Sequence, residues 1–407
     1  MTEVNKSMFS LEQENDIRCE LYILLENYSK ATLDRVHIEE YDKLLWGDIF
    51  NHLHYQIQHL YEESINPHCH KLYQEVRKEF YTSENPMRCN GDSYTTAYDK
   101  VSIKNKIRDI KKKPQPEQRT EAWYIFRQNL ITASNAWKAF GSNSSKNQII
   151  YEKCKPLDMD KYQETFGDNP LNWGKKYEDV SIQVYENIYN TKIEEFGCIS
   201  HDKHTFLGAS PDGINTDPKS TRYGRMLEIK NIYNRKITGI PKLEYWVQTQ
   251  LQMEVCNLDE CDFLETHFIE YKTEEDFLMD GTFTHTADGK QKGHILYFTN
   301  NGKSIYKYAP LNLTQEEFNV WEENQMNACE QFQWIKIIYW KLENMSNVLI
   351  LRHQPWIDQV IPKIQEVWGI IEKERVEGYE HRAPKKREKK EKKMGCLIKI
   401  ETEPSST

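Results

Sequence analysis

Three charged residues have the types and spacing to cleave a phosphodiester bond: Asp212, Glu228 and Lys230. Carboxylates are the hard oxygen ligands that Mg²⁺ takes from proteins, together with water and substrate phosphate. A bound divalent ion neutralises the charge that develops on the phosphate and lowers the pKa of a bound water. A lysine beside that ion can position the water and stabilise the same charge. The chain therefore offers the parts of a metal-dependent hydrolytic site, provided that the three side chains converge.

Two short predicted strands would position these residues. The stretch LGASPDGI (207–214) predicts a strand that ends in a type I turn, with Asp212 between a proline and a glycine. The stretch MLEIKNIY (226–233) predicts the next strand. Side chains alternate between the two faces of a strand, so Glu228 and Lys230 point the same way while the apolar residues beside them face the core.

A Glu-x-Lys pair is a weak signal by itself in a chain with 29% charged residues. The same spacing recurs at Glu270 and Lys272 and twice more near the C-terminus. The Glu270 pair lacks an aspartate on the turn of a neighbouring strand. An exposed ion pair, which contributes little to stability, is the alternative for Glu228 and Lys230. The surrounding motifs decide between the two interpretations.

Length and composition allow two or three domains, or one large enzyme domain with additions, in 407 residues. Hydrophobic residues at 38% and aromatic residues at 12% suffice for a core. There is no apolar leader and no apolar run of about 18 residues, so we expect a soluble intracellular protein without membrane contact. The 9 scattered cysteines favour reduced thiols over a disulfide framework.

Positive charge is concentrated in the segment KKREKKEKK (385–393), which has seven basic and two acidic residues. The whole chain has a net charge of -9, so a DNA-binding role would need a local basic groove or metal ions to hold the phosphates. The basic segment suits a nuclear localisation patch, a DNA tether or a solubilising tail.

The chain divides into four segments. Residues 1–103 show apolar residues at i, i+3 and i+4, which predicts a helical region of unknown role. Residues 104–118 are charged and broken by prolines, which predicts a linker. Residues 119–376 predict an α/β domain, and residues 377–407 predict a disordered basic tail.

Within the α/β domain the order of predicted elements is helices first and then an alternation of strands and helices. They are helices over 119–190, short strands over 193–230, a helix over 243–254, strands over 262–310 and long helices over 314–375.

Several stretches, in the same order, resemble the phage lambda exonuclease and YqaJ-type viral recombinase family of PD-(D/E)xK nucleases. They are RTEAWYIFRQNLITASNAWKAFG (119–141), NWGKKYEDVSIQVYE (172–186), LGASPDGI (207–214), LEIKN (227–231) and YWVQTQLQMEV (245–255), with a looser match over 348–373. Each motif alone is weak, whereas five in order are a strong signal. The resemblance covers residues 119–375.

The resemblance implies a restriction-endonuclease-like core, with a mixed central sheet flanked by helices. It implies a deoxyribonuclease that uses two Mg²⁺ ions, or Mn²⁺ in their place, and digests double-stranded DNA from its ends in the 5′ to 3′ direction. Such enzymes serve recombination, repair or replication, often in large DNA viruses, and a single-strand annealing protein would be the partner. The lambda enzyme is a ring-shaped trimer, and the oligomeric state of this chain is left open.

The resemblance also assigns roles at the predicted metal site. Asp212 and Glu228 match metal ligands, joined by Glu178 from the motif WGKKYED and by the carbonyl of Ile229. Lys230 matches the residue that activates water. The alternative for Glu178 is a solvent-facing glutamate.

A second group matches the residues that hold a terminal 5′ phosphate. Arg127 and Ser134 lie in the stretch FRQNLITAS, and arginine is a bidentate phosphate donor. Ser134 falls in the first turn of a predicted helix that Thr132 begins, where backbone N–H groups favour an anion. An ordinary N-cap beside a surface arginine is the alternative.

Glutamines on the predicted helix after the Glu-x-Lys strand complete the candidate site. Gln248 and Gln250 match a Q-x-Q pattern, and an amide can bind water or phosphate without competing for the metal. Gln248 shares a helical face with Gln252, whereas Gln250 points elsewhere. We therefore favour Gln248 as a catalytic residue and keep Gln250 as a reserve.

The segment between the two strands, NTDPKSTRYGR (215–225), is longer than a minimal hairpin. Its Lys219, Arg222 and Arg225 would meet either the DNA backbone or only solvent, and the sequence does not choose between these. Two rival functions are an endonuclease of the same fold and a non-catalytic protein that binds DNA ends. Loss of one of the three charged residues would indicate the latter, and all three are present.

Overall fold

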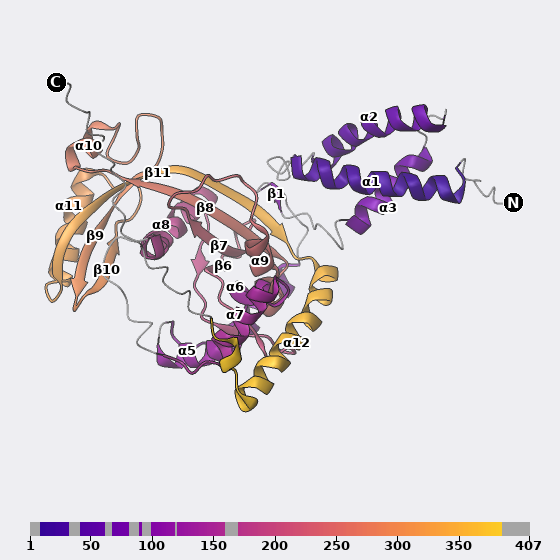
Figure 1. Ribbon diagram of the computed structural model, residues 1–407. Helices are drawn as coiled ribbons and strands as arrows, with labels where there is room; N and C mark the ends of the chain where they lie inside the picture. Colours follow the sequence, from indigo (N-terminus) through magenta and orange to yellow (C-terminus); the bar gives the residue numbers. More distant parts are fainter. Residues whose placement is uncertain are drawn as a thin grey trace, which may run out of the picture.

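A computed structural model describes residues 9–31, 41–61, 67–80, 89–91, 99–118, 120–158 and 170–384 (Figure 1). The first helices are α1 (Leu11–Ala31), α2 (Tyr41–Tyr61), α3 (Pro67–Glu79), α4 (Lys100–Lys112), α5 (Glu121–Gln128), α6 (Ala133–Ala136), the 3-10 turn η2 (Trp137–Ala139) and α7 (Asn143–Cys154). They are followed by α8 (Pro170–Tyr189), α9 (Leu243–Cys256), α10 (Glu274–Met279), α11 (Gln315–Ala328), α12 (Gln354–Glu377) and the 3-10 turn η4 (Glu380–Arg382).

The strands of the described residues form two sheets. Those of the larger sheet are β1 (Asn90–Gly91), β3 (Ile193–Glu194), β6 (Gly213–Asn215), β7 (Met226–Asn231), β8 (Glu260–Glu270), β9 (Lys292–Asn300), β10 (Lys303–Tyr308) and β11 (Gln333–Leu351). Those of the smaller sheet are β2 (Ile131–Thr132), β4 (Ile199–Ser200) and β5 (Leu207–Ala209).

The larger sheet is mixed. Its strand order is β10-β9-β11-β8-β7-β6-β3, with β1 paired to β11. β7 and β8 run parallel, and the other neighbours in this sheet run antiparallel. Helices lie against this sheet, so the predicted α/β class with a mixed central sheet is confirmed.

Helix α8 packs on the larger sheet beneath the arch that β11 forms (Figure 1). The ring of Tyr177 stacks on Phe268 of β8 with centroids 4.5 Å apart. One turn further along, Ser181 Oγ donates a hydrogen bond to Asn231 Oδ1 at 2.6 Å. An aromatic contact and a polar contact therefore fix the rotation of α8 about its axis.

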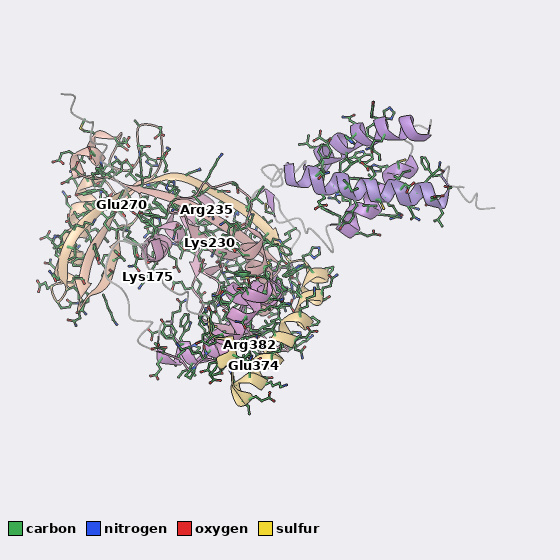
Figure 2. All side chains as sticks on the ribbon, viewed as in Figure 1. Lys175, Lys230, Arg235, Glu270, Glu374 and Arg382 are labelled. Atoms are coloured by element: carbon green, nitrogen blue, oxygen red, sulfur yellow. The ribbon has the colours of Figure 1, made fainter. Side chains whose placement is uncertain are left out.

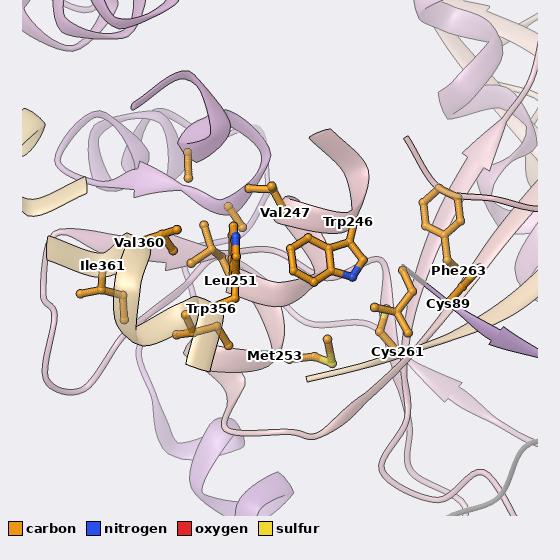
Figure 3. Packing of buried hydrophobic residues seen from close by; sticks show 14 of the residues in the cluster. Cys89, Trp246, Val247, Leu251, Met253, Cys261, Phe263, Trp356, Val360 and Ile361 are labelled. Atoms are coloured by element: carbon orange, nitrogen blue, oxygen red, sulfur yellow. The ribbon is translucent and has the colours of Figure 1, made fainter. Parts of the chain in front are cut away.

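Helix α9 lies in the main core, between the sheet and α12. Trp246 and Trp356 meet edge to face with ring centroids 4.7 Å apart. Leu251, Val360 and Ile361 fill the space around them (Figure 3). Because both faces of α9 are occupied, its position relative to β7 is well defined.

The predicted run of long helices over 314–375 is wrong in its middle third. β11 occupies Gln333–Leu351 and pairs with β9 in its first half and with β8 in its second half. Its sequence is rich in β-branched and aromatic residues, which favour a pleated surface. Helices are present on either side, as α11 and α12.

The predicted linker over 104–118 is largely a helix. α4 runs to Lys112 and begins at an N-cap, Asp99, whose side chain accepts from Val101 N. Ile103, Ile107 and Ile110 lie on one face of α4 and are buried. The charged residues between these isoleucines give the segment the composition of a linker, so its composition did not predict the apolar face of a helix.

The predicted tail over 377–407 begins too early. α12 ends at Glu377, and Arg382 then forms an ion pair with Glu374 (Figure 2). The backbone carbonyl of Arg382 accepts a hydrogen bond from Asn147 Nδ2 at 2.9 Å. The basic segment 385–393 lies outside the described residues.

Among the helices of the described ranges, none is long and apolar enough to cross a membrane.

The burial of α4 generates a stability prediction. Ile110→Ala should lower the free energy of unfolding by about 2–5 kcal/mol, because the side chain is 2% exposed and its removal leaves a cavity. Val101→Ala is the control, since Val101 on the same helix is 68% exposed and should change stability by less than about 0.5 kcal/mol. Urea unfolding measures both, and equal effects would mean that α4 does not pack on the core.

Candidate active site

Asp212 lies where the chain passes from the small sheet to the large one, between β5 and β6. β6 pairs antiparallel with β7, with Gly213 opposite Leu227. One residue further along this register, Asp212 comes opposite Glu228. The Asp212 carboxylate accepts a hydrogen bond from the backbone N–H of Ile229 at 2.6 Å. The predicted turn and the predicted strand therefore meet at this point.

Gly213 allows β3 to approach β6 beside this turn. A Cβ atom at Gly213 would lie 2.1 Å from Cγ2 of Ile193, inside any tolerated contact distance. Ile193 belongs to β3, which closes this edge of the sheet. The glycine after Asp212 therefore serves a close strand-to-strand approach.

Glu228 is a buried carboxylate held by three side chains. It is 1% exposed and forms an ion pair with Lys230, two residues along the same face of β7. Gln248 of α9 donates to Glu228 Oε1 at 2.6 Å, and Gln252 donates to Oε2 at 2.7 Å. Gln252 also donates to the carbonyl of Ser210 at 3.2 Å. The predicted convergence of Asp212, Glu228 and Lys230 is thus present in the structure.

The charges of this group act strongly on one another. Burial raises the pKa of the Asp212 carboxyl well above its usual range, and the charges of Glu228 and Glu178 raise it further. Burial lowers the pKa of Lys230, but the carboxylates of Glu228 and Asp212 outweigh that effect and raise it above its ordinary value. Several carboxylates therefore share one lysine, an arrangement that favours an additional cation.

A cavity of about 470 Å³ opens at this group. Its lining includes the acidic residues Glu178 and Asp212 and the basic residue Lys230. It also includes Arg235 and Lys242 from the segment that joins β7 to α9. The cavity therefore combines acidic groups, which suit a metal ion, with basic groups, which suit an anion.

The donors predicted for a metal ion are chemically suited to Mg²⁺. Glu178, Asp212, Glu228 and the carbonyl of Ile229 all offer hard oxygen atoms. In the described ranges, however, no group of three or more acidic, histidine or cysteine side chains is arranged to hold a metal ion. Glu228 is directed towards Lys230 and the two glutamines. The metal assignment stays a prediction.

The glutamines of α9 divide into two functions. Gln250 is fully buried, donates to the carbonyl of Leu351 at 2.7 Å and accepts from His353 N at 2.7 Å. It joins α9 to the start of α12 and does not reach the cavity, so its reserve place in the site is wrong. Gln252 donates to Glu228, a role that the sequence analysis did not predict. Its i+4 spacing from Gln248, which places both residues on one helical face, is the signal that could have indicated it.

Arg127 contacts the segment that carries Asp212 through one intermediate residue, Ser210. Its Nη1 is 3.4 Å from the hydroxyl of Ser210, two residues before Asp212. Its guanidinium lies over the ring of Trp123, 4.4 Å from the centroid. Arg127 and Trp123 line a second cavity of about 630 Å³, and Lys153 lines it as well. Burial lowers the pKa of Lys153 to about 7.

Ser134, the other residue predicted to hold a 5′ phosphate, does not line the second cavity. Thr132 is the N-cap of α6, as predicted, but its side chain makes no capping hydrogen bond. Ser134 is exposed, and its hydroxyl lies 3.3 Å from that of Thr132. The second cavity is lined by Thr132 and Asn135 from this turn, and not by Ser134. The role of Ser134 at a 5′ phosphate stays a prediction.

The arginines of the 215–225 segment are not at the surface. Arg222 donates to Asp262 at 2.6 Å, and Arg225 donates to Glu260 at 2.6 Å and to Asp262 at 3.2 Å. All four side chains are buried. Both predicted alternatives, DNA contact and solvent, are wrong for these arginines, whereas Lys219 is exposed.

Residues 122–259 match the family model of the YqaJ-like viral recombinase domain. The match includes the motifs that contain Glu178, Asp212, Glu228 and Lys230. The predicted resemblance to this family is therefore confirmed for this part of the chain.

Two curated viral proteins are similar to the chain over part of their length. An uncharacterized protein of Acanthamoeba polyphaga mimivirus is 29% identical over 302 residues, which are 64% of this chain and 54% of that protein. A protein of African swine fever virus is 27% identical over 165 residues, which are 34% of this chain and 46% of that protein. The chain spans about half the length of the curated relatives it matches.

Solved structures with a likeness to this chain include two exonucleases. An alkaline exonuclease from Laribacter hongkongensis is 18% identical with a TM-score of 0.36, covering 63% of this chain and 94% of the other. A phage-related exonuclease from Haemophilus somnus is 12% identical with a TM-score of 0.33, covering 60% of this chain and 94% of the other. Both likenesses are weak.

Proposed function

We propose a function on the premise that residues 122–259 of this chain form a YqaJ-like viral recombinase domain. The protein is a metal-dependent deoxyribonuclease that hydrolyses phosphodiester bonds from the ends of double-stranded DNA, in the 5′ to 3′ direction. It serves viral DNA recombination, repair or replication. The observation that supports this proposal is the convergence of Asp212 and Lys230, which line one cavity, with the buried Glu228 that pairs with Lys230.

The residues that would hold Mg²⁺ are Asp212, Glu178, Glu228 and, through its carbonyl, Ile229. When bound there, the ion would lower the pKa of a water ligand and neutralise charge on the phosphate. The donor chemistry fits this role, because all four ligands offer hard oxygen. Burial and, after it, the nearby negative charges raise the pKa of Asp212, and this crowding of carboxylates fits a metal ion as well.

The remaining residues would orient the reacting groups. Lys230 points along the same face as Glu228, so its ammonium group would hold the attacking water and stabilise charge on the phosphate. Gln248 and Gln252 hold the Glu228 carboxylate in one orientation without adding charge. Arg127 lies close enough to the site, through Ser210, to bind a 5′ phosphate at the strand end.

Partners belong to the same proposal. Double-stranded DNA ends would be the substrate, and a single-strand annealing protein would receive the strand that is exposed. Formation of a homo-oligomer and the role of the N-terminal helices stay predictions.

Digestion of linear and closed circular duplex DNA with Mg²⁺ tests the proposed reaction. We expect loss of linear DNA alone, and we expect Lys230→Ala to reduce the rate at least about 100-fold because it removes a charge at the reacting phosphate. Lys272→Ala is the matched control, since Lys272 belongs to another Glu-x-Lys pair, at the end of β8, and is exposed. Cutting of circles would indicate an endonuclease. Binding of ends without digestion would indicate a non-catalytic protein.

The strand-end assignment predicts a preference for 5′-phosphorylated ends. Dephosphorylated linear duplex should be digested several-fold more slowly, and Arg127→Gln should remove that difference by slowing only the phosphorylated substrate. Arg108→Gln, an exposed arginine on α4, should leave the preference intact. Initial rates on the two substrates measure the ratio. A ratio unchanged by Arg127→Gln would exclude this arginine from phosphate binding.

A further inference from the structure

The segment between β7 and α9 brings an arginine to the active-site cavity. Arg235 lies five residues after Lys230 (Figure 2). Both residues line that cavity. The Arg235 side chain is 27% exposed, so it is partly buried and still accessible to solvent. Neither the motif pattern nor the resemblance assigned it a role.

A buried carboxylate holds this arginine. Arg235 Nη2 forms a charged hydrogen bond with Glu265 of β8, whose side chain is 2% exposed. In the parallel pairing of β7 and β8, Glu265 is the partner of Lys230. The anchor therefore stands on the strand next to Lys230, on the same face of the sheet.

Such an anchor has an energetic cost that calls for an explanation. Burying a carboxylate requires a charged partner, and an ion pair of this kind is weak evidence for stability, because desolvation offsets the attraction. Its firm result is geometric: a guanidinium has five N–H donors in a fixed plane. Glu265 engages Nη2, and the carbonyl of Lys236 lies 3.4 Å from Nη1, which leaves further donors of Arg235 available for a ligand in the cavity.

The surroundings of Arg235 are basic and aromatic. The ring of Tyr245 has Lys230 Nζ at 5.2 Å, Arg235 Cζ at 5.9 Å and Lys242 Nζ at 6.0 Å from its centroid. All four residues line the cavity. Two of these cations are paired with buried carboxylates, Lys230 with Glu228 and Arg235 with Glu265, so they offer directed N–H donors and not a net positive charge. A guanidinium held in this way suits the oxygen atoms of a phosphate.

We propose that Arg235, oriented by Glu265, binds a backbone phosphate of the nucleic-acid strand, adjacent to the phosphodiester at Asp212 and Glu228. The inference rests on the proposed nuclease function and adds a substrate-binding residue to it. Arg235 contacts the substrate, and Glu265 is a positioning residue that acts through Arg235. Lys242 lies at the same ring and adds charge without a fixed geometry.

Equilibrium binding and kinetics on one set of variants test this inference. Arg235→Gln should weaken binding of a linear duplex about 10-fold or more, as expected for a lost charge-assisted hydrogen bond, and should raise KM more than it lowers kcat. It should also reduce the slope of log affinity against log salt by about 1. Lys236→Gln is the matched control, because Lys236 is the next residue, is exposed and does not line the cavity.

The anchor is tested by two further variants. Glu265→Gln should weaken binding less than Arg235→Gln while retaining the full salt slope, since the charge stays and only its orientation is lost. The double variant Arg235→Gln with Glu265→Gln leaves no buried unpaired carboxylate, so it should remain folded. It should bind no more weakly than Arg235→Gln alone, because the two residues act as one unit.

The outcomes separate this inference from the function on which it rests. If the unmodified protein neither binds nor digests duplex DNA, both proposals fail. If it digests DNA and the folded double variant matches Lys236→Gln in affinity and salt slope, the nuclease stands and the Arg235 assignment fails. A melting temperature that falls in the double variant with no change in KM would identify the pair as a purely structural ion pair.

Discussion

The structure depends on a buried negative charge at Glu228. A carboxylate that is 1% exposed is costly unless charged or polar partners surround it. Lys230 supplies the opposite charge from the same strand, and Gln248 and Gln252 supply two amide donors from α9. The strand and the helix must therefore keep a fixed relative position, or the charge loses its partners.

Much of the surrounding fold maintains that position. Trp246 of α9 packs against Trp356 of α12, and Gln250 ties α9 to the first residues of that helix. On the other side of β7, β8 carries a second set of buried charges, in which Asp262 accepts from Arg222 and Arg225. These buried pairs fix the register of neighbouring strands, because each charge would be left unsatisfied after a shift of one residue.

Local patterns were enough to predict the centre of the site. The alternation of side chains along a strand and the turn around Asp212 act over a few residues, so the convergence with Glu228 and Lys230 could be expected from the sequence. Gln252 was within reach for the same reason, since residues four apart share a helical face. Its role was missed because the family pattern named Gln250.

Contacts between distant segments could not be predicted in this way. Arg235 finds Glu265 thirty positions later only because β7 and β8 pair in parallel. The burial of Arg222 also depends on a distant segment, because its partner Asp262 lies on β8. The nineteen-residue strand β11 and the helix α4 were misjudged because short apolar runs and charge-rich stretches are compatible with more than one element until the core is known.

The most direct test of the central claim is calorimetric titration of the protein with Mn²⁺ in the absence of DNA, comparing the unmodified chain with Asp212→Asn. If the carboxylates around Glu228 form a metal site, the unmodified protein binds Mn²⁺ and the substitution abolishes or strongly weakens that binding while the melting temperature is retained. Equal binding by the two proteins, or none by either, would contradict the account.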